Sequence, residues 1–336
     1  LMALLLEKDQ IGKREDLADL IALVDVHDCP VVSTAKKGSK PGNTLMQWQA
    51  DAYAASVTTG TVDGTDVSAY ENPGENRAIL SNYVQIHRRV VRVSPLALEI
   101  SNVAGIKDEI SSGIARKLVE IKRDMETRYL LQEGDSGADA QLDAGGSTPY
   151  LTKSLGEWIS TAGGAVLQVP EAFRTPTASI ETTATTANIT DTTVQDVLSS
   201  IYSETGSIKN YMMPLGRTLK RAFTDRMTGT RAATGATDLP ATQVRTFSPL
   251  SGKKVTFAVD IFEGDFGTVR LVPDNFAPAL TDGYVLDMDG IEIRYGKLPE
   301  IKELPDAGGG PIRMIEAVAA LIVHNPLSHG KFNLGS

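Results

Sequence analysis

The clearest pattern of apolar and polar positions in the chain is a single apolar stripe over residues 106–132. Apolar side chains recur there every three to four residues, as along one face of an α-helix; they are Ile106, Ile110, Ile114, Leu118, Ile121, Met125 and Tyr129. At 1.5 Å per residue the stripe predicts one helix of about 40 Å, and Gly134 is typical of the residue that follows a helix. A helix of this length with one apolar face indicates a spine along which a sheet packs.

A long strand-like excursion lies immediately before this predicted helix, over residues 44–93. Its outgoing limb, 44–53, carries large apolar side chains, and its returning limb, 79–93, is rich in β-branched residues. Residues 56–76 show little apolar periodicity and contain turn formers, namely Gly60, Gly64, Pro73 and Gly74. The pattern predicts a two-stranded ribbon of some tens of ångströms with a loop at its tip. Because such a ribbon is only marginally stable alone, we expect it to lean on another surface.

The N-terminal residues, 1–43, are predicted to form an arm. Helical spacing of apolar residues indicates a short amphipathic helix at 13–24, and glycine and proline indicate a flexible link at 36–43. The apolar start, Leu1 to Leu6, is short and lacks a basic flank, so we expect an arm that packs on another surface rather than a secretory signal. A single monomer cannot bury both an arm and a protruding ribbon. The layout therefore favours a chain that packs against neighbours.

The rest of the chain mixes short helices with strands. We expect three further helices. One lies at 153–162, one begins at a capping box formed by Thr192 and Gln195, and one runs from Pro214 to Phe223. Strands are expected in the last third, at 255–262, 268–272, 285–288, 291–295 and 312–324. Asp289-Gly290 predicts a type I′ hairpin turn between two of them. The predicted fold class is α+β, with a middle α/β block at about 136–252 inserted into a helix-plus-sheet block.

Composition and charge narrow the classes of function. Of the 336 residues, 41% are hydrophobic and 22% are charged, as in chains that form a sizeable core. The net charge of −9 and the pI of about 5.1 argue against a general nucleic-acid binder. No apolar run approaches the roughly 18 residues of a membrane span, so no membrane partner is expected. Cys29 is the only cysteine, which excludes a disulfide within the chain.

Several short motifs look like known catalytic or phosphate-binding sites but lack their companions. Asp265-Phe266-Gly267 matches the metal-binding triplet of protein kinases, without the Gly-rich and catalytic loops. Gly308 to Gly310 is not followed by the Lys-Ser or Lys-Thr of a phosphate-binding loop. We expect a turn at each position. Cys29 lies in an apolar context, and we expect a core cysteine rather than a nucleophile.

The candidate metal ligands are equally incomplete. Asp135, Asp139 and Asp143 are evenly spaced in a loop, but the spacing is not that of an EF-hand. His324 and His329 are five residues apart across a proline and do not form a helical ligand pair. We predict no catalytic residues, no metal, no cofactor and no enzyme activity.

One charge cluster remains, on the returning limb of the ribbon. Strand alternation places Arg88 and Arg92 on one face and His87 and Arg89 on the other. Either these residues are a solvated surface, or the arginines pair with carboxylates at the tip of a neighbouring ribbon. The hypothetical intersubunit contact residues are Arg88, Arg89, Arg92, Asp63, Asp66, Glu71 and Glu75.

The order of these elements resembles that of the major capsid proteins of tailed bacteriophages with the Hong Kong 97-type fold. The likeness is strongest in two stretches. One is Val90-Val91-Arg92-Val93-Ser94 followed by the predicted helix to Leu131. The other runs from Tyr211-Met212-Met213-Pro214 to Phe262-Glu263-Gly264-Asp265-Phe266-Gly267-Thr268-Val269-Arg270-Leu271-Val272-Pro273-Asp274. The chain is most similar to the SU-ten-like subgroup.

The resemblance implies four regions: an arm (1–43), an extended loop (44–93), a peripheral domain (94–135 and 253–336) and an axial domain (136–252). It implies hexamers and pentamers of the chain in an icosahedral head that encloses double-stranded DNA without sequence-specific binding. Implied partners are further copies of the chain, a portal, and scaffold or cement proteins. The implied location is the virion, after assembly in the host cytoplasm.

Two alternatives stay open. A cellular encapsulin-type shell has the same fold and would enclose an enzyme instead of DNA. An enzyme with an unrecognised site is the other alternative, and a pocket with clustered, perturbed carboxylates would favour it.

Overall fold

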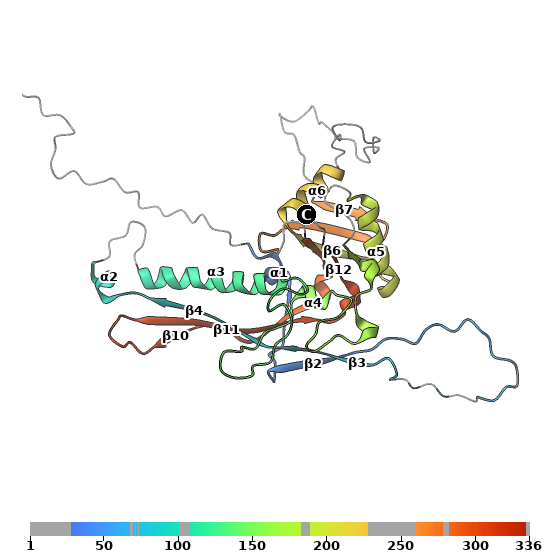
Figure 1. Cartoon of the computed structure of the whole chain (residues 1–336), viewed down its shortest axis with the longest axis horizontal. Helices are drawn as coiled ribbons and strands as arrows, with labels where there is room; N and C mark the ends of the chain where they lie inside the picture. Colours follow the sequence, from blue (N-terminus) through green and yellow to red (C-terminus); the bar gives the residue numbers. More distant parts are fainter. Residues whose placement is uncertain are drawn as a thin grey trace, which may run out of the picture.

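The computed structural model describes residues 28–67, 70, 72, 74–100, 108–182, 189–227, 260–277 and 282–333. Two sheets lie side by side, an elongated four-stranded one and a more compact six-stranded one, and a loop projects away from both (Figure 1). The predicted arm helix at 13–24 lies outside the described residues. The described fold is α+β, as the sequence predicts.

The elongated part consists of helix α3 (Glu109–Leu130) packed on a sheet with strand order β1-β10-β11-β4. The strands are β1 (Lys36–Gly38), β10 (Ile291–Leu304), β11 (Ile312–Val323) and β4 (Gln85–Arg92). The side chain of Asp108 accepts the N–H of Ile110 at 3.0 Å and caps the helix. The apolar stripe of α3 is buried with the facing side chains of β11, including Ile315 and Leu321. The predicted spine helix is confirmed over these residues.

The returning limb of the ribbon is two strands rather than one. β3 (Ala78–Tyr83) pairs with β2 (Leu45–Ala50), whereas β4 joins the four-stranded sheet beside β11. The break falls at Val84, whose N–H donates to the carbonyl of Thr44 at 3.0 Å. The side chain of Val84 is buried with Met46, Ala320 and Ile322. The ribbon therefore continues directly out of the main sheet.

The compact part has a sheet with strand order β5-β12-β9-β6-β8-β7. Its strands are β5 (Ile180–Glu181), β12 (Gly330–Asn333), β9 (Asp282–Val285), β6 (Lys209–Leu215), β8 (Gly267–Pro273) and β7 (Ile261–Gly264). Helices α5 (Asp191–Thr205) and α6 (Arg217–Met227) belong to this part, and their apolar faces share a core with the sheet. Four of the six strands come from the predicted peripheral segment 253–336, so the sheet is not confined to residues 136–252.

Shorter elements connect these parts. They are α1 (Pro30–Thr34), α2 (Pro95–Ile100), α4 (Leu155–Trp158) and the 3-10 turns η2 (Glu171–Phe173), η3 (Thr177–Ser179), η4 (Met288–Gly290) and η5 (Pro326–Ser328). The predicted helix at 153–162 is a single turn, α4. Trp158 is completely buried in α4, so the apolar side chains of this one turn fill the core without a longer helix.

Two predicted helix starts are wrong. The capping box of α5 is formed by Thr190 and Thr193, two residues earlier than predicted, because each threonine side chain bonds the other's backbone N–H. Pro214 lies in β6, and α6 begins at Arg217. β6 pairs with β8 along its length. On its other side it meets β9 at Leu215 and forms an isolated bridge at Met212, and this sparse pairing accommodates a residue without an N–H.

The predicted hairpin at Asp289-Gly290 is also wrong. β9 pairs with β12 in the six-stranded sheet, whereas β10 pairs with β11 in the four-stranded sheet. Between them η4 is closed by Asp287, whose side chain accepts the N–H of Asp289 at 3.1 Å and whose carbonyl accepts the N–H of Gly290 at 3.0 Å. Asp289-Gly290 does lie in a turn, but this turn connects the six-stranded sheet to the four-stranded sheet.

Replacing Ile121 by Ala tests the α3–sheet contact. Ile121 is 1% exposed in the core beneath α3, so truncation leaves a cavity and is expected to lower the free energy of unfolding by about 3 kcal/mol. Urea denaturation followed by circular dichroism measures the change. Lys122→Ala, at the exposed next position, is the control and is expected to change stability by less than about 0.5 kcal/mol. Equal effects of the two variants would contradict the packing described.

Candidate assembly interface

The projecting loop exposes apolar side chains that its own chain does not cover. Tyr53 and Tyr70 are 101% and 90% exposed, and three valines of the tip are more than 70% exposed, namely Val57, Val62 and Val67. The loop extends well beyond the body of the molecule (Figure 1). Several large exposed apolar side chains on one protruding element are typical of a surface that contacts another protein.

The base of the ribbon, in contrast, is fixed by buried hydrogen bonds. Asn82 on β3 is completely buried. Its amide nitrogen donates to the carbonyl of Leu321 on β11 at 2.7 Å and to the hydroxyl of Thr152 at 2.9 Å. Its amide oxygen accepts the N–H of Lys153 at 2.8 Å. One side chain thus ties the ribbon to the main sheet and to the segment before α4.

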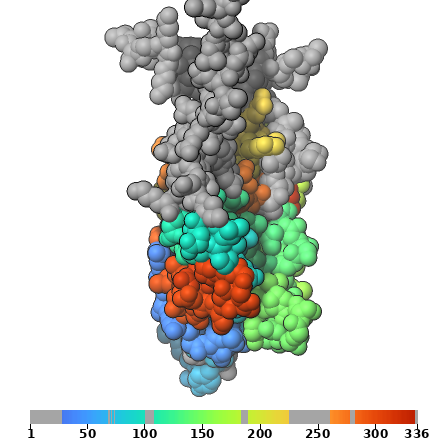
Figure 2. Space-filling view, turned by 90° about the vertical axis from the view of Figure 1, so that its left-hand side faces the viewer, coloured from blue at the N-terminus to red at the C-terminus, as the bar shows by residue number. Residues whose placement is uncertain are grey.

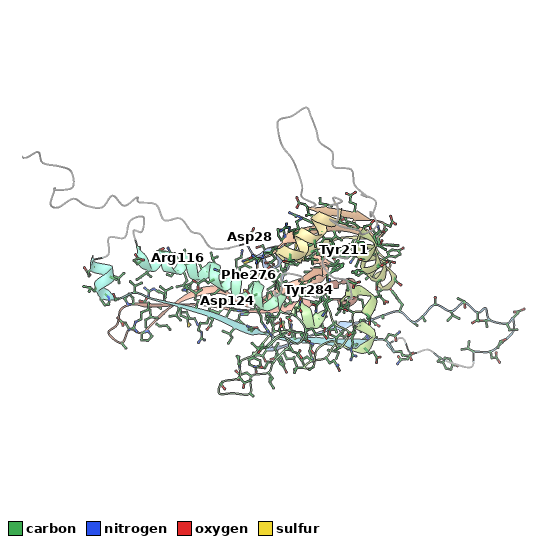
Figure 3. All side chains as sticks on the ribbon, turned by 45° about the horizontal axis from the view of Figure 1, so that its top comes forward. Asp28, Arg116, Asp124, Tyr211, Phe276 and Tyr284 are labelled. Atoms are coloured by element: carbon green, nitrogen blue, oxygen red, sulfur yellow. The ribbon has the colours of Figure 1, made fainter. Side chains whose placement is uncertain are left out.

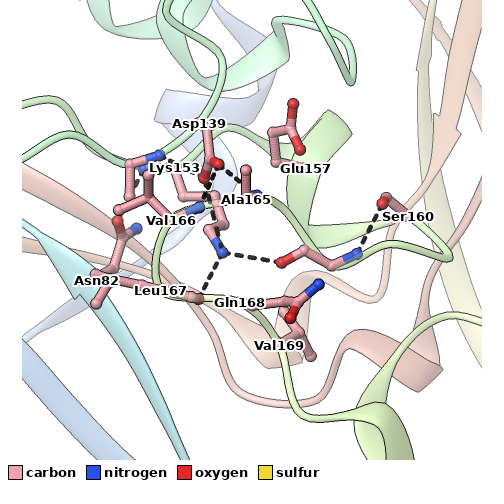
Figure 4. A network of polar contacts seen from close by, with 12 residues as sticks. Asn82, Asp139, Lys153, Glu157, Ser160, Ala165, Val166, Leu167, Gln168 and Val169 are labelled. Atoms are coloured by element: carbon pink, nitrogen blue, oxygen red, sulfur yellow. Dashed lines mark hydrogen bonds and ion pairs between the residues drawn. The ribbon is translucent and has the colours of Figure 1, made fainter.

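Lys153 extends this network toward the loop at 163–168 (Figure 4). Its side chain is completely buried, and its ammonium donates to the carbonyls of Gly163 at 3.1 Å and Leu167 at 2.7 Å. The ammonium also lies 5.0 Å from the centre of the Trp158 ring and 3.9 Å from Asp139. Burial lowers the pKa of Lys153 to about 8, and the nearby carboxylates oppose this change. The network connects the base of the ribbon to the loop at 163–168.

Each arginine of the predicted contact cluster has a carboxylate partner in its own chain. Arg88 bonds Glu316 on β11 at 2.7 Å, and Arg92 lies 3.9 Å from Asp306 in the β10–β11 turn. Arg89 forms a two-pronged pair with Asp124 on α3, at 2.5 and 2.7 Å. The sequence did not reveal these partners, because they lie 35 to 228 positions away.

The alternation predicted for this strand is confirmed. Arg88 and Arg92 face outward with about half of each side chain exposed, whereas His87 and Arg89 face α3. His87 is buried, and burial lowers its pKa to about 4, so it is neutral at physiological pH. Arg88 and Arg92 are the more exposed arginines, but 40% of the Arg89 side chain is also exposed.

The carboxylates predicted to meet these arginines are at the ribbon tip. Asp63, Asp66 and Glu75 are exposed, and Glu71 lies outside the described residues. Within the described part of the chain these three carboxylates form no ion pair. The described residues therefore do not bring the predicted arginines and the tip carboxylates together within one subunit.

The motifs suggestive of chemistry have structural roles. Asp265-Phe266-Gly267 forms the turn between β7 and β8, as predicted; Gly267 has φ 148°, and a side chain there would collide with the carbonyl of Lys209. The three amides of Gly308 to Gly310 are occupied by the carboxylate of Asp306, so they do not form an open phosphate cradle. This turn packs under the start of α2, at the end of the molecule shown in Figure 2.

The acidic loop and the two histidines likewise bond to neighbouring groups of the same chain. Asp139 accepts the N–H groups of Ala165 and Val166 at 2.5 and 2.6 Å. His324 pairs with Glu292 at 2.8 Å. Among the described residues, no group of three or more His, Cys, Asp or Glu side chains could hold a metal ion.

One Ser-His-Asp set lies close together but does not have the arrangement of a catalytic triad. Nδ1 of His329 accepts the backbone N–H of Asp287 at 3.1 Å. The ring proton is therefore on Nε2, which faces Ser328 at 3.5 Å and cannot remove the serine proton. All three residues are buried.

Comparison with known proteins identifies the family. A family model described as SU10 major capsid protein matches residues 6–334. The chain belongs to this family. It is also 34% identical to the major capsid protein of Escherichia phage Phieco32 over 151 residues. That match covers 44% of this chain and 39% of the relative, so it spans about two fifths of the relative's length.

Solved structures show that this family member has the expected fold. It superimposes on a chain of the cyanophage A-1(L) capsid asymmetric unit with a TM-score of 0.63 and 12% identity, covering 97% of both chains. Similarity to a chain of Mycobacterium phage Bobi gives a TM-score of 0.60 at 9% identity over 96% of both chains. The mature capsid of bacteriophage PhiM1 gives a TM-score of 0.58 at 11% identity, covering 96% and 92%. The Hong Kong 97-type capsid fold predicted from the sequence is confirmed. In the described part of the capsid protein, no helix has the length and apolar character needed to cross a bilayer.

Removing the buried amide of Asn82 tests the anchoring of the ribbon base. Asn82→Ala leaves a buried N–H and a buried carbonyl without partners, so we expect unfolding free energy to fall by about 2–3 kcal/mol. Gln47→Ala on the exposed face of β2 is the matched control. Urea denaturation measures both variants. A loss no larger than that of the control would contradict the anchoring role of Asn82.

Proposed function

We propose that the chain is the repeating subunit of an icosahedral phage head that encloses double-stranded DNA and is built from hexamers and pentamers. The single observation that carries this proposal is the protruding ribbon with its uncovered apolar tip, in a chain of the SU10 major capsid protein family. Shell closure multiplies contacts, so each contact can be modest in energy. Assembly in the host cytoplasm, and a portal with scaffold or cement proteins as partners, belong to the same proposal.

The proposed placement of the parts is the one that the resemblance to Hong Kong 97-type capsid proteins implies. The elongated sheet with α3 forms a peripheral domain, and the six-stranded sheet with α5 and α6 forms an axial domain near the capsomer axis. Strands from 261–285 and 330–333 would then extend the axial domain beyond the segment 136–252. The ribbon tip would lie over the adjacent subunit and bury its exposed tyrosines and valines there.

Of the alternatives, family membership favours a phage head over an encapsulin-type shell, since the matching family is one of phage major capsid proteins. An enzyme is disfavoured because the matching family is one of structural capsid proteins. A portal and terminase encoded beside the chain would support the head, and a cargo enzyme would support the encapsulin.

Substituting the apolar side chains of the tip tests the proposed role of the ribbon. Replacing Val57, Val62 and Val67 by Ser is expected to leave the fold intact but to abolish shells, because the apolar area available to a neighbour is lost. Deleting residues 57–76 is expected to have the same effect. Circular dichroism reports the fold, and negative-stain electron microscopy with size-exclusion chromatography reports assembly.

The matched control replaces Thr58, Thr61 and Thr65 by Ser, which changes the same loop without removing large apolar side chains. This control is expected to assemble normally. Shells of normal size and yield from the valine variant or the deletion would refute the role of the tip.

Neutralising the tip carboxylates tests their proposed pairing with Arg88 and Arg92 of a neighbouring subunit. Asp63→Asn, Asp66→Asn and Glu75→Gln together remove three charges without breaking any described ion pair within the subunit. Exposed pairs contribute about 0.2–1 kcal/mol each, so the subunit concentration needed for assembly is expected to rise several-fold at low salt. Light scattering across a dilution series at low and high salt measures this concentration.

The control for this experiment is Glu171→Gln, Asp196→Asn and Glu204→Gln, which changes net charge equally at exposed positions outside the ribbon. It is expected to assemble as the unsubstituted chain does. If the tip variant and the control assemble alike at low salt, the carboxylates remain solvated and the pairing is wrong.

A further inference from the structure

The chain contains three Asp-Gly dipeptides, and the structure places them in three different backbone environments. They are Asp63-Gly64, Asp282-Gly283 and Asp289-Gly290. An aspartate rearranges most readily before glycine, because glycine has no side chain to hinder attack of its nitrogen on the neighbouring carboxyl group, and its backbone turns freely. In a folded protein the rearrangement also requires that the backbone can bring the nitrogen and the carboxyl carbon together. The three sites can therefore be compared with one another.

Asp63-Gly64 lies in the tip of the projecting loop, and both residues are exposed. Figures 1 and 3 show this loop clear of the rest of the chain. A turn spans the dipeptide, with the N–H of Thr65 donating to the carbonyl of Val62 at 3.2 Å. Among the described residues no group accepts the N–H of Gly64, and beyond the adjacent residues no atom lies within 4 Å of the position of a Cβ there. The Gly64 nitrogen is thus free to approach the Asp63 carboxyl group.

Asp282-Gly283 is the opposite case, because both residues are buried in β9. Asp282 is 1% exposed, and the dipeptide is paired with β12. A Cβ at Gly283 would lie 2.7 Å from the side chain of Met213 and 2.9 Å from that of Leu219. The backbone has no room to rearrange here unless the strand first opens.

Asp289-Gly290 combines an exposed carboxyl group with a fixed backbone. The Asp289 side chain is 81% exposed and pairs with Lys36 at 2.8 Å. The N–H of Gly290 donates to the carbonyl of Asp287 at 3.0 Å, and the carbonyl of Gly290 accepts the N–H of His324 at 2.9 Å. The nitrogen that would attack is therefore already bonded. This site separates exposure of the carboxyl group from freedom of the backbone.

We propose that Asp63 is a site of spontaneous isoaspartate formation in the folded, free subunit. The Gly64 nitrogen attacks Cγ of the Asp63 carboxylic acid, so that a C–N bond forms and a C–O bond breaks. The departing hydroxyl group takes the amide proton and leaves as water. Water then opens the five-membered imide ring. Opening at the main-chain carbonyl gives isoaspartate, whereas opening at Cγ restores aspartate, and neither route needs an oxidant or another reactant.

The product changes the tip of the loop in two ways. The main chain becomes one methylene group longer between Asp63 and Gly64, and the carboxylate is attached directly to Cα. The turn from Val62 to Thr65 then loses the spacing that its hydrogen bond requires. The modification concerns the free subunit and goes beyond shell formation. Its failure would leave the capsid proposal unaffected, and so the two can be distinguished.

The experiment follows isoaspartate at all three sites during incubation at neutral pH and physiological temperature. The full-length chain is diluted until size-exclusion chromatography shows free subunits, and a second sample is denatured in guanidinium chloride. Digestion at mildly acidic pH and electron-transfer fragmentation, which distinguishes the two backbones, assign the product to each site. Dividing each rate by the rate of the same site in the denatured chain removes the effect of local sequence.

We expect Asp63 in the folded chain to isomerise within about threefold of its rate in the denatured chain. Asp282 and Asp289 are expected to isomerise at least about tenfold more slowly than in the denatured chain, because their reaction needs local opening of the fold. If Asp63, after the same division, is no faster than Asp289, the proposal is overturned.

Asp63→Glu is the decisive variant. Glutamate keeps the charge, but it would need a six-membered ring that forms far more slowly, so the isoaspartate of the tip peptide is expected to disappear. Asp66→Glu is the matched control, since it makes the same change in the same loop before Val67 instead of a glycine. It is expected to keep the full product at Asp63. Asp63→Asn is unsuitable, because asparagine before glycine forms the same imide with loss of ammonia.

Circular dichroism checks that both glutamate variants keep the fold, as is expected for substitutions at exposed loop positions. A tip signal that survives Asp63→Glu, or one that is lost in Asp66→Glu, would show that Asp63 is not the site.

Discussion

The burial of one face of α3 against the four-stranded sheet is the contact on which the rest of the structure depends. The outer strand of that sheet, β4, continues through Val84 into the ribbon. The strands β10 and β11 form the long free end of the sheet. The same helix carries Glu126, Arg128 and Tyr129 into the core, where it meets the arm and the segment before α4. Displacing α3 would therefore disturb every extended part at once.

Polar groups are unevenly divided between the base of the ribbon and its tip. At the base, Asn82, Arg128 and Lys153 are buried and bonded to backbone carbonyls from distant segments. At the tip, apolar side chains and carboxylates are exposed. A base fixed by buried hydrogen bonds, with an uncovered tip, suits an element whose contacts are made with another molecule.

Patterns that depend on local geometry could be predicted from the sequence. The stripe of α3, the alternation of His87 to Arg92 and the turn at Asp265-Phe266-Gly267 each follow from a short stretch of residues. Features set by distant partners could not be predicted. The carboxylates facing Arg88 and Arg89 lie on β11 and α3, Asp289-Gly290 joins two sheets instead of two paired strands, and Pro214 is accommodated by sparse pairing in β6.

The central claim is that this chain assembles with copies of itself. The most direct test is to express the full chain alone and to examine it by negative-stain electron microscopy and size-exclusion chromatography. Closed shells, capsomer rings or tubes are the predicted result, and the particle diameter would begin to define the lattice. A well-behaved monomer at every concentration, even with neighbouring genes co-expressed, would contradict the account.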